Sequence, residues 1–161
     1  MFDKVYAFEP DSVAFNELSG NVALNGFSNV ELNNSAVYNH NDSISIGVGP
    51  HPKGMSQTSI LYNGDIETVK CQTLRRIFED RQIPKGQLLK IDIEGAEYCL
   101  FDDVEFFKQY RPKIMCEVHL SMMGEDKAKH LREALKNLKP LYNHITPLPI
   151  HNQLVIMMYI E

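Results

Sequence analysis

The stretch that decides the fold is QLLKIDIEGAEY, residues 87–98. Its first half, residues 87–93, is a mainly apolar segment of strand length, which is typical of a strand buried in a parallel sheet. Asp92 and Glu94 bring two carboxylates to the end of this run, and Gly95 allows the chain to turn sharply there. The stretch therefore predicts a buried strand that ends in a polar, ligand-accessible turn.

On either side of this stretch, apolar runs of strand length alternate with segments of helical spacing. The expected strands are 4–8, 29–37, 87–93 and 113–119, and the expected helices are 12–25, 74–78, 98–110 and 128–138. Such alternation indicates an α/β fold with a mainly parallel sheet and helices on its faces. Asp11 or Ser12 can cap the first of these helices, and Asn25-Gly26 can end it.

Two regions depart from the alternation and predict antiparallel pairing. Residues 43–73 contain two stretches of alternating polar and apolar residues separated by glycines and prolines, which indicates a hairpin insertion. Residues 141–146 and 153–160 have no helix between them, which predicts an antiparallel hairpin at the carboxyl-terminal edge of the sheet. We expect one domain that spans residues 1–161.

In open α/β sheets, ligands bind beyond the carboxyl ends of the strands, and Glu9 is the first candidate at such an end. A carboxylate there can accept hydrogen bonds from both hydroxyls of a ribose. A carboxylate near a helix start is also favoured by the helix dipole alone, so both interpretations stay open. Asn33, Asn34 and Ser35 precede Ala36 at the next strand end, where they could contact an adenine edge or form a plain turn.

Asp92 and Glu94 are two residues apart and share one face if the strand persists through Glu94. Either could act as a general base on an acceptor hydroxyl. The pair could also bind a divalent cation, or one acid could cap the following helix. We predict a catalytic or binding role for at least one of them and no metal.

Glu117 and His119 lie two residues apart at the end of the 113–119 strand, where His119 could be a general base or a structural histidine bonded to a carbonyl. Gly47-Val48-Gly49 is best interpreted as a hairpin loop, because no helix opens after it. The remaining candidates belong to loops that could touch an acceptor: His51, Lys53, Met55, His151 and Asn152.

The bulk properties exclude several classes of protein. The net charge of −5 argues against nucleic acid as a main partner. No signal peptide and no apolar stretch of membrane-spanning length is visible, so we expect a cytoplasmic protein without a membrane partner. Three cysteines without metal spacing indicate reduced, buried thiols.

Three blocks of the sequence together resemble the FkbM family of class I methyltransferases. They are KVYAFEPDSVAFNELSGNVALNG with NVELNNSAV, then TLRRIFEDRQIPKGQLLKIDIEGAEYCLF, then RPKIMCEVH. The resemblance implies a Rossmann-like sheet, S-adenosylmethionine as methyl donor and O-methylation of a hydroxyl. It places Glu9 at the donor ribose, Ser35 and Ala36 near adenine, and Asp92 and Glu94 near donor and acceptor.

The sequence departs from the family pattern in two places. Arg75 follows Thr73-Leu74, where the family usually has an acid. The family's first strand and glycine-rich turn would precede the AFEP strand, where this sequence has only Met1, Phe2 and Asp3, so we expect a sheet truncated at its amino terminus. Because that strand normally separates the AFEP and KIDIE strands, we expect these two to pair directly in a chain that folds alone.

The sequence thus predicts an S-adenosylmethionine-dependent O-methyltransferase with Asp92, Glu94 and His119 as catalytic residues. Glu9, Ser35, Ala36 and Asp92 are its expected cofactor contacts. The acceptor is expected to be a small molecule or glycan, and the chain could form a homodimer. The alternative is a catalytically inactive interaction module of the same fold; a nicotinamide-binding domain is disfavoured because its glycine fingerprint is absent.

Overall fold

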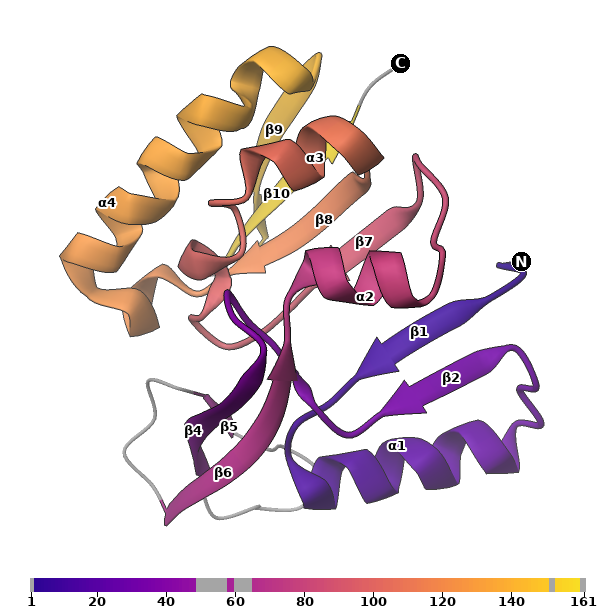
Figure 1. Ribbon diagram of the computed structural model, residues 1–161. Coiled ribbons are helices and arrows are strands. Elements are labelled where there is room, and N and C mark those ends of the chain that lie inside the picture. The colour runs from indigo at the N-terminus through magenta and orange to yellow at the C-terminus, as the bar shows by residue number, and fades with distance from the viewer. Residues whose placement is uncertain (1, 49–57, 60–64, 151–152, 160–161) are drawn as a thin grey trace. The chain divides into compact units, whose positions relative to one another are not determined.

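The computed structural model describes residues 2–48, 58–59, 65–150 and 153–159 (Figure 1). The chain divides into two compact units, Met1–Gln72 and Thr73–Glu161. Each unit is described by itself below.

Unit 1 holds a β–α–β element followed by a small mixed sheet. In chain order it contains β1 (Val5–Phe8), α1 (Ser12–Leu24), β2 (Val30–Asn33), β3 (Ala36–Val37), β4 (Asp42–Val48), β5 (Thr58–Ser59) and β6 (Asp65–Gln72). Strands β1 and β2 are parallel, with Val5 opposite Val30 and Phe8 opposite Asn33. Helix α1 connects them and lies alongside the pair (Figure 1).

The ends of α1 are those that the sequence predicts. The Oδ1 atom of Asp11 accepts hydrogen bonds from the backbone N–H of Val13 at 2.8 Å and of Ala14 at 2.9 Å. Asn25 ends the helix, and Gly26 follows in the left-handed region with φ 65°.

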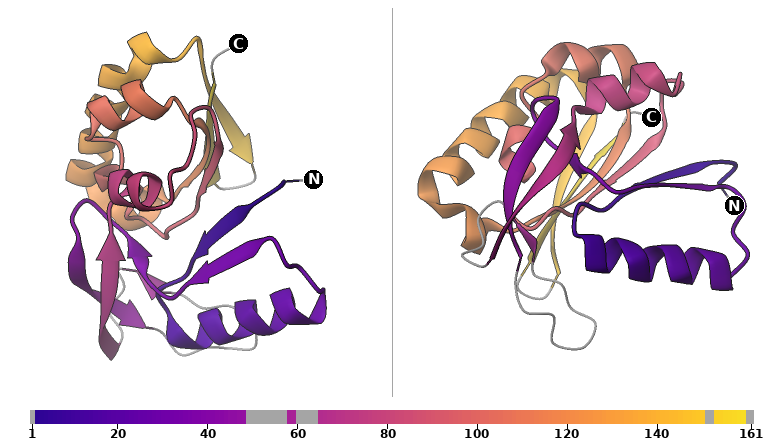
Figure 2. Two further views of the ribbon diagram at one scale, coloured as in Figure 1. Left: turned by 45° about the vertical axis from the view of Figure 1, so that its right-hand side comes forward. Right: turned by 60° about the horizontal axis from the view of Figure 1, so that its bottom comes forward.

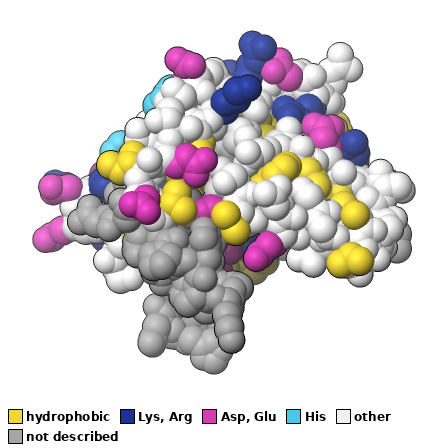
Figure 3. Space-filling view, turned by 90° about the horizontal axis from the view of Figure 1, so that it is seen from below, with side chains coloured by type: hydrophobic (Ala, Val, Ile, Leu, Met, Phe, Trp, Pro, Cys, Tyr) yellow, Lys and Arg dark blue, Asp and Glu magenta, His cyan; other side chains and the backbone are white. Residues whose placement is uncertain are grey.

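On the face drawn in Figure 3, hydrophobic side chains reach the surface in small groups among acidic and basic ones.

The second sheet of unit 1 has the strand order β3-β6-β4-β5. Strands β4 and β6 are antiparallel, with Ile44 opposite Val69, so residues 43–48 and 68–72 are indeed strands. Its small core contains Ala36, Ile46, Val69 and Cys71. The core is built by every second residue of a strand, as half-buried strands require.

Unit 2 holds the third sheet and most of the helices. In chain order it contains α2 (Leu74–Asp80), β7 (Leu88–Ile91), the 3₁₀ turn η1 (Glu97–Cys99), α3 (Val104–Tyr110), β8 (Lys113–Val118), α4 (Leu120–Leu138), η2 (Lys139–Leu141), β9 (His144–Ile150) and β10 (Gln153–Tyr159). The strand order is β7-β8-β10-β9, in which β7 and β8 are parallel and the other pairs antiparallel. Helices α2, α3 and α4 gather on one side of this sheet (Figures 1 and 2).

The core of unit 2 follows the strand periodicity of β8. Ile114, Cys116 and Val118 are buried on one face, and Cys116 stands between Ile91 of β7 and Ile156 of β10. Their row of apolar side chains faces the buried phenylalanines of the segment around α3. The largest fully buried aromatic side chains are those of Phe101, Phe106 and Phe107.

Several features of the fold differ from the sequence prediction. A single, mainly parallel sheet is not confirmed, because the described residues form three sheets, two of them mixed. Strand β4 is antiparallel to β5 and β6, and β9 is antiparallel to β10. Hairpin connections produce such antiparallel pairs, whereas parallel strands need a long crossover. The direct pairing expected between the AFEP and KIDIE strands stays a prediction; within its own unit, β1 pairs with β2, and β7 pairs with β8. The antiparallel carboxyl-terminal hairpin is confirmed by β9 and β10.

The helix expected at 98–110 is interrupted. A short turn at Glu97–Cys99 is separated from α3 by Asp102 and Asp103, and Asp103 caps α3. The break allows Phe101 as well as Phe106 and Phe107 to enter the core, which one straight helix would not permit. The prediction of buried cysteines outside disulfides is confirmed, since Cys71, Cys99 and Cys116 are buried and none of them is in a disulfide bond.

The edge strand of the third sheet contains two prolines. Pro147 and Pro149 are two residues apart in β9, opposite Ile156 and Leu154 of β10. Residues at this spacing have their backbone nitrogens on the same side of the strand.

Among its described helices, the chain has none with the length and apolar character needed to cross a membrane.

Arg75 has a structural partner that the family pattern did not suggest. Its Nε and Nη2 atoms donate to the two carboxylate oxygens of Asp103 at 2.8 and 2.6 Å. Asp103 Oδ1 also accepts from the backbone N–H of Phe106 at 2.9 Å, so one carboxylate caps α3 and pairs with α2. The hydrogen bonds from Arg75 hold the pKa of Asp103 below its ordinary value.

We predict that Asp103→Ala lowers the free energy of unfolding by about 1–2 kcal/mol at neutral pH, because both the cap and the Arg75 pair are lost. The control is Glu105→Ala, which removes only an exposed pair with Lys108 and should cost less than about 0.5 kcal/mol. Because the pKa of Asp103 is depressed, its contribution is present above the ordinary aspartate pKa of about 4 and is lost as the pH falls through the lower folded value. Urea unfolding at several pH values measures this; a wild-type advantage that stayed constant down to pH 2 would contradict it.

Candidate functional site

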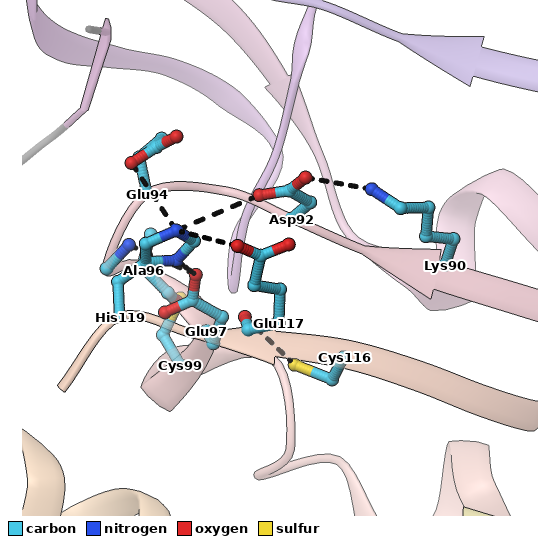
Figure 4. A network of polar contacts seen from close by, with 10 residues as sticks. Lys90, Asp92, Glu94, Ala96, Glu97, Cys99, Cys116, Glu117 and His119 are labelled. Atoms are coloured by element: carbon cyan, nitrogen blue, oxygen red, sulfur yellow. Dashed lines mark hydrogen bonds and ion pairs between the residues drawn. The ribbon is translucent and has the colours of Figure 1, made fainter. Parts of the chain in front are cut away.

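The candidate site in unit 2 lies where two parallel strands end. Asp92 directly follows β7, and His119 directly follows β8. Because β7 and β8 are parallel neighbours, their carboxyl ends meet at the same edge of the sheet. Figure 4 shows the side chains of Asp92, Glu94, Glu97 and Glu117 gathered around the imidazole of His119.

The strand does not persist through Glu94, so the prediction that Asp92 and Glu94 share a strand face is wrong. Strand β7 ends at Ile91, and Glu94 and Gly95 turn the chain through the left-handed region with φ values of 53° and 97°. A left-handed backbone costs a non-glycine residue on the order of 1–3 kcal/mol. The turn nevertheless brings the carboxylates of Asp92 and Glu94 to the same histidine, His119. The alternation of side chains along a strand does not predict this geometry.

One ring nitrogen of His119 is held by a buried carboxylate. Nδ1 of His119 lies 2.9 Å from Oε1 of Glu97, whose side chain is 0% exposed, while that of His119 is 9% exposed. The same Oε1 atom accepts the backbone N–H of Gly95 at 3.1 Å. This contact fixes the orientation of the ring and leaves Nε2 as the nitrogen that faces the rest of the site.

The other ring nitrogen faces three more carboxylates. Nε2 of His119 lies 3.5 Å from Oε2 of Glu94, 3.7 Å from Oε1 of Glu117 and 3.9 Å from Oδ1 of Asp92. The second oxygen of Asp92 pairs with Nζ of Lys90 at 2.8 Å. Negative charge is therefore concentrated on the Nε2 side of the ring.

The surroundings shift the pKa values of the cluster. Burial acts to lower the pKa of His119, but the hydrogen bond to Glu97 and the negative charge of Glu94 outweigh it, and the net shift is upward. Burial also raises the pKa of Glu94, an effect that the nearby His119 partly offsets. Both shifts follow from placing several acidic groups around one partly buried base.

Glu97 is the member of the site that sequence reasoning missed. It lies in an otherwise apolar segment between Ala96 and Cys99, all three of which are buried. An acid at a buried position needs a partner, so the apolar pattern around Glu97 was the available signal. Its Oε2 atom has no hydrogen-bond partner among the described residues.

Three of the four candidate cofactor residues, Glu9, Ser35 and Ala36, lie in unit 1, whereas Asp92 belongs to the cluster in unit 2. The N–H of Glu9 donates to the carbonyl of Asn33 at 3.1 Å, and Nδ2 of Asn34 donates to the carbonyl of Glu9 at 2.9 Å. These bonds bring the end of β1 beside the end of β2. The carboxylate of Glu9 accepts the N–H of Asp11 at 2.9 Å, and burial raises its pKa although that bond acts to lower it.

Ser35 and Ala36 have structural contacts of their own. Ser35 is buried, and its Oγ accepts a hydrogen bond from Nε2 of Gln72 at 3.3 Å. Ala36 belongs to the apolar core of its sheet. Their expected contact with adenine stays a prediction.

The loop candidates for contact with an acceptor lie outside the described residues; they are His51, Lys53, Met55, His151 and Asn152.

Comparison with known proteins identifies the family of the chain. The family model for the methyltransferase FkbM domain matches residues 3–142, a span that contains β1, the cluster around His119 and α4. The chain belongs to the FkbM methyltransferase family. Membership extends over both units, so the residues of β1 and those of the cluster belong to one matched region.

A solved structure supports the fold of this FkbM domain. The crystal structure of the methyltransferase FkbM from Methylobacillus flagellatus KT matches with a TM-score of 0.61 at 14% identity. The match covers 98% of this chain and 37% of the other, so the chain spans little more than a third of that protein's length. No curated protein matches the sequence.

We predict that His119→Ala destabilises the FkbM domain by about 3 kcal/mol or more, because it leaves the buried carboxylate of Glu97 without its partner. In the double variant Glu97→Gln/His119→Ala the buried charge is gone, so its loss should be clearly smaller than the sum of the two single losses. Urea unfolding of the four proteins forms the thermodynamic cycle. Additive losses would show that the two side chains are not energetically coupled.

Proposed function

We propose that the chain is the core of an S-adenosylmethionine-dependent O-methyltransferase that acts on a hydroxyl of a small molecule or glycan. Family membership indicates methyl transfer in general. The observation that carries the finer proposal is the cluster of Asp92, Glu94 and His119 at the carboxyl ends of two parallel strands. That edge is where α/β sheets bind their ligands.

The parallel pairs support a Rossmann-like arrangement as part of the proposal. Strands β1 and β2 are parallel and joined by α1, and β7 and β8 are parallel and joined by η1 and α3. Such crossover units are the building blocks of nucleotide-binding sheets. In this proposal the donor binds at the carboxyl ends of parallel strands, as nucleotides do in α/β sheets.

On the donor side, Glu9 receives the two hydroxyls of the ribose. Its carboxylate stands at the end of β1, and one oxygen is oriented by the N–H of Asp11. Hydrogen bonds between hydroxyls and an ionised carboxylate contribute on the order of 1.5–3 kcal/mol each. The backbone at Ser35 and Ala36 meets the adenine in this arrangement, since their own side chains are buried.

On the acceptor side, a hydroxyl oxygen attacks the methyl carbon of the donor in line with the sulfur. The O–C bond forms as the S–C bond breaks, S-adenosylhomocysteine leaves, and the hydroxyl proton passes to the cluster of Asp92, Glu94 and His119. Positioned acids and bases contribute about 10²–10⁴ in rate, and alignment of the two reactants contributes more. Lys90 supports this geometry by orienting Asp92.

The decisive test is calorimetric titration of the chain with S-adenosylhomocysteine. We expect binding with a micromolar dissociation constant, about 8 kcal/mol of binding free energy. A folded, monodisperse sample that does not bind would instead support a catalytically inactive module. A titration with NAD checks the third interpretation and should show no binding.

We predict that Glu9→Ala weakens donor binding about tenfold or more, because bonds worth at least about 1.5 kcal/mol are lost. The matched control is Glu17→Ala, which removes an exposed carboxylate from α1 in the same unit and should leave the affinity unchanged. Equal affinity of wild type and Glu9→Ala would remove the ribose assignment.

A further inference from the structure

We propose that Asp92, Glu94 and His119 form a binding site for one divalent transition-metal ion. Each contributes one ligand atom, and these atoms all lie within 4.8 Å of one another. Oε1 of Glu117, 3.7 Å from Nε2 of His119, is the nearest further oxygen. This inference goes beyond methyl transfer and beyond the sequence prediction, which included no metal ligand.

The spacing of the ligand atoms suits a small cation. Zinc–nitrogen and zinc–oxygen bonds of about 2.0–2.2 Å place neighbouring ligand atoms roughly 3–4 Å apart. Nε2 of His119 lies 3.5 Å from the Glu94 oxygen and 3.9 Å from the Asp92 oxygen. Both separations from Nε2 therefore fall in the range that shared coordination of one ion requires.

Glu97 provides a second, independent observation. Metal-binding histidines almost always donate their other ring N–H to a carboxylate, which fixes the tautomer and the ring orientation. Glu97 does this for His119 at 2.9 Å from a fully buried position. Because Nδ1 faces Glu97, Nε2 is the ring nitrogen that faces the oxygens of Asp92 and Glu94, so it is the atom placed to share an ion with them.

The charge balance favours a cation at this point. Four carboxylates, those of Asp92, Glu94, Glu97 and Glu117, surround one imidazole (Figure 4). Lys90 pairs with Oδ2 of Asp92, whereas Oδ1 is the oxygen that faces Nε2. Oε2 of the buried Glu97 has no hydrogen-bond partner among the described residues, so this carboxylate is not fully compensated by the protein groups around it.

The strained backbone of the turn agrees with a ligand-binding role. Glu94 adopts φ 53°, and this conformation directs its carboxylate to His119. Strained residues persist where the surrounding structure requires them, often at ligand sites. A glycine at this position would remove the strain but also the ligand.

The donor set indicates which ions bind. One imidazole nitrogen with two carboxylates suits Mn²⁺ or Zn²⁺, whereas Ca²⁺ prefers six to eight oxygen ligands. We therefore expect Mn²⁺ and Zn²⁺ to bind and Ca²⁺ to bind at least tenfold more weakly.

The test is titration of the EDTA-treated, dialysed chain with Mn²⁺, with the free ion followed by electron paramagnetic resonance. We expect one ion per chain and at least a tenfold loss of affinity in Glu94→Gln and in Asp92→Asn. Both substitutions keep the side-chain volume and leave the buried Glu97–His119 pair in place. Thermal unfolding of each variant confirms that it is folded.

The matched control is His130→Ala. Nε2 of His130 lies 2.8 Å from Oδ1 of Asp102 in an exposed pair on the same unit, and this variant should bind Mn²⁺ as the wild type does. Absence of stoichiometric Mn²⁺ binding, or binding that survives in both Glu94→Gln and Asp92→Asn, would overturn the proposal. Because the titration contains no methyl donor, its outcome is independent of S-adenosylhomocysteine binding and of the proposed enzymatic function.

Discussion

The hydrogen bond between Nδ1 of His119 and the buried carboxylate of Glu97 joins the two chain segments that leave the sheet after β7 and β8. Through Glu97 it also holds the N–H of Gly95, and so it sets the course of the turn that presents Glu94. One buried hydrogen bond thus links the conformation of the turn, the orientation of the histidine ring and the position of the acidic groups. A polar interaction at a buried position has this influence because leaving either partner alone is costly.

The predictions from sequence succeeded where local patterns dominate. The helix from Asp11 to Gly26 could be placed because a capping aspartate and a left-handed glycine act through their own neighbouring backbone groups. The strands ending at Ile91 and Val118 could be placed because apolar residues predominate in both segments. The association of Asp92, Glu94 and His119 followed from the general position of ligands at strand ends.

The features that the sequence did not predict have a common cause. Each of them depends on a contact between residues that are far apart in the chain. Nothing local to Glu97 indicates that its partner lies 22 residues later. Asp103, which caps α3, also pairs with Arg75 of another helix, and no local pattern indicates that pair. The division of strands into three sheets likewise depends on which hairpins close, and periodicity describes only single strands.

The two prolines of β9 have a consequence for the association of this protein with itself. Strand β9 is the last strand on its side of the sheet, and an exposed strand edge normally offers a row of N–H groups to any other chain. Pro147 and Pro149 lack these groups at two positions that face the same way. Strand β9 therefore has two fewer N–H donors than its length would otherwise give it, which makes this edge a poorer template for pairing with another chain.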